Sequence, residues 1–477
     1  MAFDTQAWLD EARALIGNAH VHIADNNEEL SAYTRDWRGK FHGQALAVLR
    51  PANTEEVQGI VRLAASTGVA LVPQGGNTGM CGAAVPDNSG LQVVLNLGRL
   101  NRIRDIDPQN NTATVEAGCI LQTLQEKAAE VDRLFPLSLG AEGSCQIGGN
   151  IATNAGGVQV LRYGNMRDLV LGLEVVLPNG EVLDILRGLR KDNTGYDLKH
   201  LFIGSEGTLG VITAATVKLY PAPSAKVVAF AGVDSIVQAI QLLADMRAHL
   251  GERFSAFELI SSDSLTLVQN YFPDTPDLLN APYPWYILME AADGGDEESL
   301  REAMQNALMV CLEAGTLQDV ALASNLAQAR ALWTVRENIT HAQQMDGGNI
   351  KHDVSLSISD IPAFIEDILP QLEHAFPGAR PIVYGHLGDG NLHFNVAAPS
   401  GVESGQWQLL TNEVNKVIHD AVSARRGSIS AEHGIGQLKR HELELYKTDV
   451  ELNVMRQIKK ALDPAGLMNP GKVIQAI

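Results

Sequence analysis

Glycines gather in four short stretches of the first half of this 477-residue chain, and these stretches constrain its fold more than any other feature. They span residues 75–82, 140–149, 156–157 and 204–210. The first follows an apolar run at 69–72 that predicts a strand, within a β-α-β opening. Glycine-rich loops after strands commonly hold a diphosphate through backbone N–H groups. We therefore expect a diphosphate-containing cofactor in this half of the chain.

Two familiar diphosphate motifs do not account for these loops. No Gly-x-Gly-x-x-Gly occurs in the sequence, which removes the main support for a Rossmann nicotinamide site. Residues 466–472 nearly spell a P-loop, but Val473 stands where Ser or Thr is required. The glycine loops therefore indicate a different cofactor-binding fold.

Composition limits the partners and the compartment. The formal net charge of −20 argues against nucleic acid and against an anionic membrane surface, because both attract basic proteins. An anionic substrate would then require a local cationic pocket. The four cysteines show no Cys-x-x-Cys spacing, which argues against a zinc–thiolate site or a disulfide framework. The sequence shows neither a signal peptide nor an apolar run of about 18 residues. We predict a cytoplasmic protein without a transmembrane segment.

The order of predicted elements indicates an α+β chain with three parts. Residues 1–221 form the first, and Pro221-Ala-Pro223 is a stiff break after it. Residues 222–425 repeat the β-α-β order of elements with antiparallel strands, as in a ferredoxin-like sheet. Residues 426–477 are expected to complete the active site. The predicted strands are 45–50, 69–72, 92–96, 112–116, 169–177, 181–185, 226–233, 254–259, 285–291 and 392–396. The predicted helices are 8–16, 57–67 with Thr54 as N-cap, 121–131, 236–250, 298–314 and 360–376.

Two glycine-containing stretches near the C-terminus, 384–395 and 430–436, contain the residues best suited to bind a metal and to transfer a proton. Their His386, His393 and Glu432 offer two imidazoles and a carboxylate, the ligand set of a catalytic zinc-type site with one position left for substrate. Zinc is favoured because it has no redox chemistry of its own, but manganese, cobalt and iron would accept the same ligands.

His433 and Asn395 lie beside these proposed ligands in the sequence. His433 follows Glu432 directly and can move a proton near neutral pH. Asn395 is two residues from His393 in an apparent strand, so both side chains point to one face.

Three longer motifs resemble a known family. Residues 73–79, 138–157 and 202–213 resemble the FAD-binding domain of vanillyl-alcohol-oxidase-type flavoproteins, and the C-terminal motifs resemble the matching FAD-linked oxidase C-terminal domain. The resemblance covers about residues 40–475. It implies a two-subdomain FAD-binding domain of the PCMH type, a ferredoxin-like antiparallel substrate domain and a C-terminal helical segment. The chain is most similar to the D-2-hydroxyglutarate dehydrogenase subgroup, with D-lactate dehydrogenases next.

The resemblance implies which residues hold the flavin. No histidine lies between His42 and His200, so we expect noncovalent FAD. Relatives often carry Gly where Asn77 stands, a departure that could alter the diphosphate contacts. The implied cofactor residues are Pro73, Gly75, Gly76, Asn77, Thr78 and Gly79 at the diphosphate, Ser138, Gly143, Ser144, Gly148, Asn150 and Asn154 at the ring and ribityl chain, Ile212 at the adenine, and Asn469.

The resemblance also implies the substrate side of the site. It makes His386, His393 and Glu432 metal ligands, His433 the general base and Asn395 a substrate contact. Arg336 and Thr340, one helical turn apart, and Lys351 are implied carboxylate anchors, with Tyr384 as a weaker candidate in the same pocket. Arginine binds a carboxylate as a fork and lysine adds a point charge. Two cationic groups suit a dicarboxylate better than lactate.

The resulting hypothesis is metal-assisted oxidation of a D-2-hydroxy acid, best D-2-hydroxyglutarate to 2-oxoglutarate, with hydride transfer to flavin N5. D-lactate and D-malate are the alternative substrates, and a flavin- or metal-binding subunit without turnover is the alternative class. The expected electron acceptor is a soluble partner such as electron-transfer flavoprotein, or a quinone, with oxygen left open. A homodimer is expected.

Overall fold

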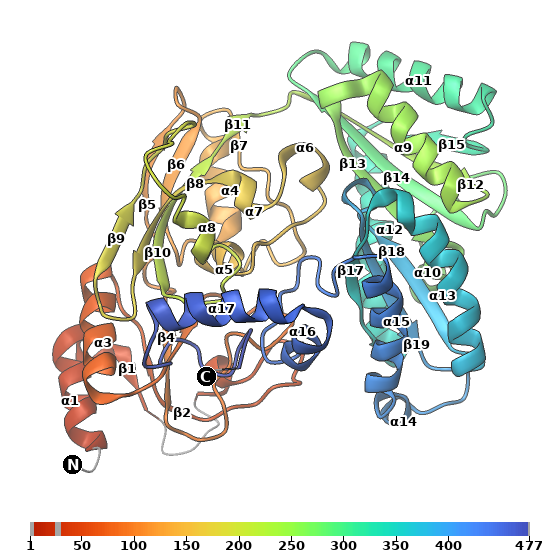
Figure 1. The fold of residues 1–477 in the computed structure, drawn as a ribbon. Coiled ribbons are helices and arrows are strands. Elements are labelled where there is room, and N and C mark those ends of the chain that lie inside the picture. The colour runs from red at the N-terminus through yellow and green to blue at the C-terminus, as the bar shows by residue number, and fades with distance from the viewer. Residues whose placement is uncertain (1–3, 24–29, 476–477) are drawn as a thin grey trace. The chain divides into compact units, whose positions relative to one another are not determined.

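The chain folds into two compact units. The computed structural model describes residues 4–23 and 30–475 (Figure 1). The first unit comprises Met1–Gly156, Asn165–Pro221 and Glu432–Ile477. The second unit comprises Gly157–Gly164 and Ala222–Ala431.

The first sheet of the first unit has strand order β1-β2-β4-β3, with β3 and β2 both parallel to β4. Its strands are β1 Val21–His22, β2 Ala45–Leu49, β3 Leu71–Gln74 and β4 Gln92–Asn96. Helices α1 (Thr5–Ile16) and α3 (Thr54–Thr67) pack on it through a shared apolar core. All five residues of β4 are buried, as expected for a central parallel strand.

The residue that caps α3 differs from the sequence prediction. Asn53, and not Thr54, is the N-cap, and its side chain accepts a hydrogen bond from the backbone N–H of Glu56. The hydroxyl of Thr54 instead donates to Glu174 Oε1 at 2.6 Å. Glu174 lies on the second sheet, so Thr54 connects the first sheet of this unit to the second.

The second sheet of the first unit is antiparallel, with order β5-β6-β10-β8-β9. Its strands are β5 Ile103–Asp107, β6 Thr112–Glu116, β8 Val170–Val176, β9 Val182–Ile185 and β10 Val211–Lys218. The hairpin β8–β9 turns at Gly180, whose φ of 79° suits glycine. The shorter elements around the sheets are α2 Ser31–Thr34, α4 Leu121–Ala129, α5 Ile147–Ala152, α7 Met166–Leu169, α8 Lys199–Phe202, β7 Arg133–Leu134 and β11 Tyr220–Pro221.

The C-terminal segment belongs to the first unit and reaches its first sheet. Helices α16 (Arg440–Tyr446) and α17 (Asp449–Leu462) precede the Pro- and Gly-rich turn, which is not helical, as predicted. Leu71 of β3 donates its N–H to Leu467 O at 2.9 Å and accepts from Asn469 N at 2.8 Å. The turn therefore pairs with β3 just before the first glycine loop.

The second unit is built on one antiparallel sheet with helices on both faces. The order is β15-β12-β14-β13-β18-β19-β16, and β17 also pairs with β19. Its strands are β12 Ala225–Val233, β13 Phe254–Ser261, β14 Trp285–Asp293, β15 Asp319–Leu322, β16 Asn349–Ile350, β17 Asp353–Ser355, β18 Arg380–Gly385 and β19 Asn391–Ala397. Its helices are α6 Val160–Tyr163, α9 Ile236–Leu250, α10 Ser262–Tyr271, α11 Glu297–Glu313, α12 Leu326–Met345, α13 Ile361–Ala375, α14 Ser404–Gln408 and α15 Thr411–Ala424.

Alternation along the strands sorts the second unit into two cores. In β13, Phe257 and Leu259 join the core shared with α9, α11, α13 and α15. Ile260 joins the opposite core, shared with α10 and α12. Glu258 has the parity of Ile260, so its side chain belongs to the face covered by α12. This placement prepares the site described below.

The predicted α+β class is confirmed, with antiparallel sheets in both units. Most predicted elements are present within a few residues, although the strand predicted at 69–72 lies at Leu71–Gln74. Helices α10 and α15 are among the elements that the sequence did not predict. Over the part of the chain that the structure describes, none of the helices has the length and apolar character needed to span a bilayer.

Candidate active site

The first two glycine loops touch each other. The loop at 75–79 follows β3 directly, and a Cβ added at Gly76 would lie 2.1 Å from the carbonyl oxygen of Ser144. Only glycine allows two backbones to come this close. A Cβ at Gly75 would meet Gln146 and the backbone nitrogen of Gly149. The structure therefore brings together the two segments predicted to hold the diphosphate and the ring.

A second close approach seats helix α5. The backbone N–H of Gly148 donates to Ala117 O at 2.7 Å, and a Cβ at Gly148 would lie 2.6 Å from the Ala117 Cβ. Asn150, in the same helix, is buried and donates to Cys145 Sγ at 3.5 Å. The segment that follows β6 is thus pinned against the second glycine loop.

Three predicted asparagines adopt left-handed backbone conformations. Asn77, Asn154 and Asn469 have φ values of 53°, 51° and 45°. Asparagine tolerates this region better than other non-glycine residues. Asn77 donates its amide to Arg35 O at 2.8 Å, so its side chain shapes the loop in addition to any cofactor contact. The Asn77 side chain therefore has a structural role, because a glycine at this position could not donate to Arg35 O.

The remaining predicted cofactor residues are distributed around the same loops. Ile212 is buried in β10, at a β-bulge in the pairing with β8. Pro73 lies in β3, next to Gly207, whose added Cβ would approach the proline ring at 3.2 Å. Thr78 and Ser138 are half-buried, and the exposed positions are Gly79, Gly143 and Ser144.

Unpartnered polar atoms near these loops fit a bound dinucleotide. Within the described residues, the buried Gln146 Oε1 and Asn469 Oδ1 have no hydrogen-bond partner in the protein. Asn469 donates its amide to Ala83 O and to Glu206 O at 2.7 Å, which holds it beside the loop region. Buried acceptors without a partner are costly unless a ligand or water satisfies them. The close-packed glycine loops and these acceptors together fit FAD.

A buried glutamate that the sequence did not single out supports the C-terminal segment. Glu206 is 6% exposed and accepts the backbone N–H groups of Ile435 at 2.7 Å and Gly436 at 2.8 Å. Burial raises the pKa of Glu206 to about 7, because the two N–H donors and Lys439 offset only part of the lost hydration. A Cβ added at Gly434 would lie 2.8 Å from Glu206 Oε1, so a side chain there would displace this carboxylate. Glu206 therefore holds the turn that follows His433.

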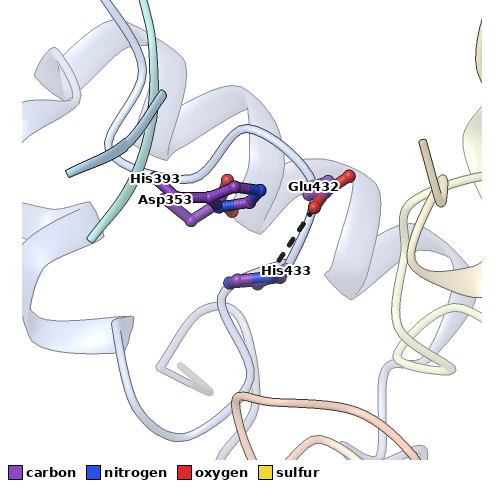
Figure 2. A group of neighbouring side chains, drawn as sticks. All are labelled: Asp353, His393, Glu432 and His433. Atoms are coloured by element: carbon purple, nitrogen blue, oxygen red, sulfur yellow. Dashed lines mark ion pairs between the residues drawn. The ribbon is translucent and has the colours of Figure 1, made fainter. Parts of the chain in front are cut away.

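A group of four side chains near the predicted metal site could hold a cation. Asp353, His393, Glu432 and His433 each offer one ligand atom, and these atoms lie within 4.8 Å of one another (Figure 2). Glu432 Oε1 and His433 Nε2 are 3.8 Å apart. Two imidazoles and two carboxylates suit zinc, manganese, iron or cobalt. The structure thus places His393 and Glu432 in one group with Asp353 and His433.

Strand pairing and one backbone hydrogen bond account for this gathering. Asp353 in β17 pairs with His393 in β19, so the two residues are direct neighbours across the sheet. The N–H of Ala431 donates to Asp353 O at 3.2 Å, and Glu432 is the next residue in the chain. Asn391 donates its amide to Asp353 Oδ1 at 2.9 Å and orients that carboxylate.

His386 lies next to His393 but is tied to another carboxylate. The two imidazole rings are 5.6 Å apart and perpendicular. His386 Nδ1 is 2.6 Å from Glu258 Oε1. Within the described residues, His386 is not among the four whose ligand atoms lie within 4.8 Å. Metal-binding histidines usually donate one ring N–H to a carboxylate and bind the metal through the other ring nitrogen.

The predicted carboxylate anchor Arg336 shares the same glutamate. Its Nε donates to Glu258 Oε2 at 2.8 Å, and its guanidinium carbon lies 4.6 Å from the centre of the Tyr384 ring. Burial favours the neutral form of Glu258, but His386 and Arg336 outweigh it and hold the pKa of Glu258 at about 2. The sequence prediction therefore missed a carboxylate that offsets part of the Arg336 charge.

Thr340 and Asn395 belong to a hydrogen-bonded network around Tyr384. The Thr340 hydroxyl is 3.4 Å from the Tyr384 hydroxyl, which also accepts from Gln343 Nε2 at 3.3 Å. Asn395 donates to Gln343 Oε1 at 2.9 Å and accepts the backbone N–H of His352 at 3.0 Å. Asn395 thereby positions the segment that carries the half-buried Lys351.

Two of the residues missed from the sequence are carboxylates at buried strand positions. Glu258 is a single carboxylate within the apolar strand Phe254–Ser261, and Asp353 follows a buried histidine at the start of a strand. A lone charge in an otherwise apolar strand must be paired or hydrogen-bonded. Gln343 carries no such signal, because polar residues are common in helices.

Comparison with known proteins agrees with this architecture. Residues 222–473 match the family described as FAD linked oxidases, C-terminal domain, and residues 45–186 match the FAD binding domain family. The chain belongs to the FAD-linked oxidase family. It is therefore a flavin-dependent oxidoreductase. The match of residues 45–186 to the FAD binding domain family supports the predicted FAD.

Relatives and solved structures support the same family. D-2-hydroxyglutarate dehydrogenase, mitochondrial, of Arabidopsis thaliana is 40% identical over 95% of this chain and 79% of the relative. A D-2-hydroxyglutarate–pyruvate transhydrogenase of Saccharomyces cerevisiae is 35% identical over 97% of this chain and 93% of the relative. The crystal structure of p-cresol methylhydroxylase with substrate bound aligns with a TM-score of 0.75 at 16% identity, covering 98% of this chain and 97% of that chain. The last likeness supports the vanillyl-alcohol-oxidase type of fold.

Proposed function

We propose that this flavoenzyme oxidises D-2-hydroxyglutarate to 2-oxoglutarate with the help of a divalent metal. The names of the relatives motivate the substrate class. The observation that carries the proposal is Arg336. Within the described residues its hydrogen bonds use only Nε, so both Nη groups can meet a carboxylate. Lys351 supplies the second cation for a dicarboxylate.

The proposed metal ligands are His386, His393 and Glu432, with Asp353 adding a carboxylate beside them. The substrate hydroxyl and one carboxylate oxygen would take the remaining positions. A bound divalent metal would lower the pKa of the substrate hydroxyl, and FAD would accept the hydride at N5. Zinc is favoured among the metals that this ligand set accepts.

His433 is the proposed general base. It takes the hydroxyl proton at an imidazole nitrogen while the α-hydrogen leaves as hydride, so the substrate loses one proton and one hydride and becomes the 2-oxo acid. Glu206 fixes the turn after His433 through Ile435 and Gly436. Tyr384, stacked against the Arg336 guanidinium, and Thr340 line the carboxylate anchor.

A substrate panel tests the proposal. Flavin reduction with D-2-hydroxyglutarate, D-malate and D-lactate should favour the five-carbon acid. Arg336→Met should lower kcat/KM for D-2-hydroxyglutarate about 30- to 100-fold, the value of a lost charge-assisted hydrogen bond. Arg330→Met, an exposed arginine of the same helix, is the matched control and should change little. Equal activity on D-lactate and D-2-hydroxyglutarate, or no flavin reduction at all, would contradict the proposal.

Several features of the proposed enzyme stay predictions. A noncovalent FAD, a homodimer and a cytoplasmic location rest on the sequence alone. The proposed electron acceptor is electron-transfer flavoprotein or a quinone. The name of the yeast relative suggests a second candidate, a 2-oxo acid such as pyruvate. Reoxidation of the reduced enzyme by each acceptor, followed spectroscopically, separates them.

A further inference from the structure

Glu258 connects two parts of the proposed substrate site through one buried side chain. Its side chain is 1% exposed, in β13 near the middle of the antiparallel sheet. β13 pairs with β18 with Leu259 opposite Gly385, so Glu258 faces the position of His386 in register. Its two oxygens have separate partners, Arg336 on one side and His386 on the other.

The Arg336 contact fixes the orientation of the guanidinium. Nε donates to Glu258 Oε2 at 2.8 Å while the plane lies over the Tyr384 ring at 4.6 Å. These two contacts restrain the position of the guanidinium. The Nη edge is consequently presented as a preformed fork for a substrate carboxylate.

The His386 contact fixes which ring nitrogen carries the proton. An ionised carboxylate can only accept hydrogen bonds, so the short contact of 2.6 Å requires a proton on Nδ1 of His386. In the neutral imidazole, Nε2 then carries the lone pair that a metal needs. The ring lies against His393, 5.6 Å between centroids, in the region of the proposed metal ligands.

We propose that Glu258 is a positioning residue for both halves of the site: it aims Arg336 at a substrate carboxylate and selects the His386 tautomer that can bind a metal. The inference deepens the proposed function and rests on it. A merely structural ion pair would stabilise the fold without changing ligand affinity, and this difference makes the two roles separable.

Glu258→Gln is the decisive variant. Its amide has one acceptor oxygen, so it cannot accept from both partners, and an NH₂ facing His386 would favour the opposite tautomer. Zn²⁺ affinity, measured by competition with a chromophoric chelator, should fall about 10- to 100-fold. The affinity for 2-oxoglutarate, measured by calorimetry on the FAD-containing protein, should fall as well.

Glu290→Gln is the matched control. Glu290 is also a buried glutamate of this sheet, and it accepts hydrogen bonds from Ser255 and from Trp333 of the same helix α12. The control should keep both affinities. Wild-type affinities in Glu258→Gln, or equal losses in both variants, would overturn the role of Glu258. If Glu258→Gln does not fold, Glu258→Asp, whose side chain is one methylene shorter, must show the same losses of affinity. Wild-type binding of Zn²⁺ and 2-oxoglutarate by Glu258→Asp would also overturn the role of Glu258.

The same assay separates this inference from the proposed function. A wild-type protein that binds neither Zn²⁺ nor 2-oxoglutarate would refute both. A wild-type protein that binds both, with unchanged affinities in the Glu258 variant, would refute only the positioning role.

Discussion

The buried carboxylate of Glu206 makes the stability of the first unit depend on pH in a direction that can be calculated. Its pKa of about 7 lies above the ordinary value of 4.5, so its contribution to stability is full below 4.5 and is lost as the pH rises through 7. With a pKa of 4.5 in the unfolded chain and about 7 in the folded protein, the free energy of unfolding should fall by about 2 kcal/mol between about pH 5.5 and about pH 8.5.

Chemical denaturation of the wild type and of Glu206→Gln at these two pH values isolates that contribution. Glutamine cannot ionise, so the difference in unfolding free energy between the two proteins should change by about 2 kcal/mol in favour of the variant as the pH rises. The constant cost of the substitution cancels in this comparison. Glu181→Gln, at an exposed position in the hairpin turn, should show no such change. A difference that does not vary with pH would refute the reasoning about the burial of Glu206.

Three further substitutions test other parts of the account. Gly76→Ala would place a Cβ 2.1 Å from Ser144 O and should weaken FAD binding about tenfold or more in a fluorescence titration, whereas Gly140→Ala, with open space around it, should not; equal affinities would remove the close-approach argument. His433→Ala should keep its yellow colour but lose about 10² in turnover, and near wild-type turnover would exclude it as the base. Asp353→Asn should lower the metal content after dialysis, and full occupancy would place Asp353 outside the metal site.

The sequence predicted the site better where the chemistry is carried by the residues themselves. His393 and Glu432 can be recognised by their ligand type, and the structure brings them within one group. Asn395 and Arg336 were assigned by resemblance, which says nothing of their partners. The structure shows that Asn395 is held by Gln343 and His352, and that Arg336 is held by Glu258.

The missed features depend on pairing between distant segments. Asp353 lies next to His393 only because β17 and β19 are in register, and no local pattern specifies that register. Glu206 is separated from Ile435 by 229 residues, so its role follows from the packing of the C-terminal turn. Thr54 was a reasonable N-cap by residue type, but the neighbouring Asn53 caps the helix and leaves Thr54 to bind Glu174.

The most direct test of the central claim is an anaerobic titration of the purified yellow protein with D-2-hydroxyglutarate, repeated after chelation and after metal is restored. We predict that the flavin absorbance bleaches with about one equivalent of substrate, that chelation abolishes the bleaching while FAD stays bound, and that Zn²⁺ or Mn²⁺ restores it. A flavin band unchanged by the substrate, or bleaching that persists after complete removal of metal, would contradict metal-assisted oxidation of this acid.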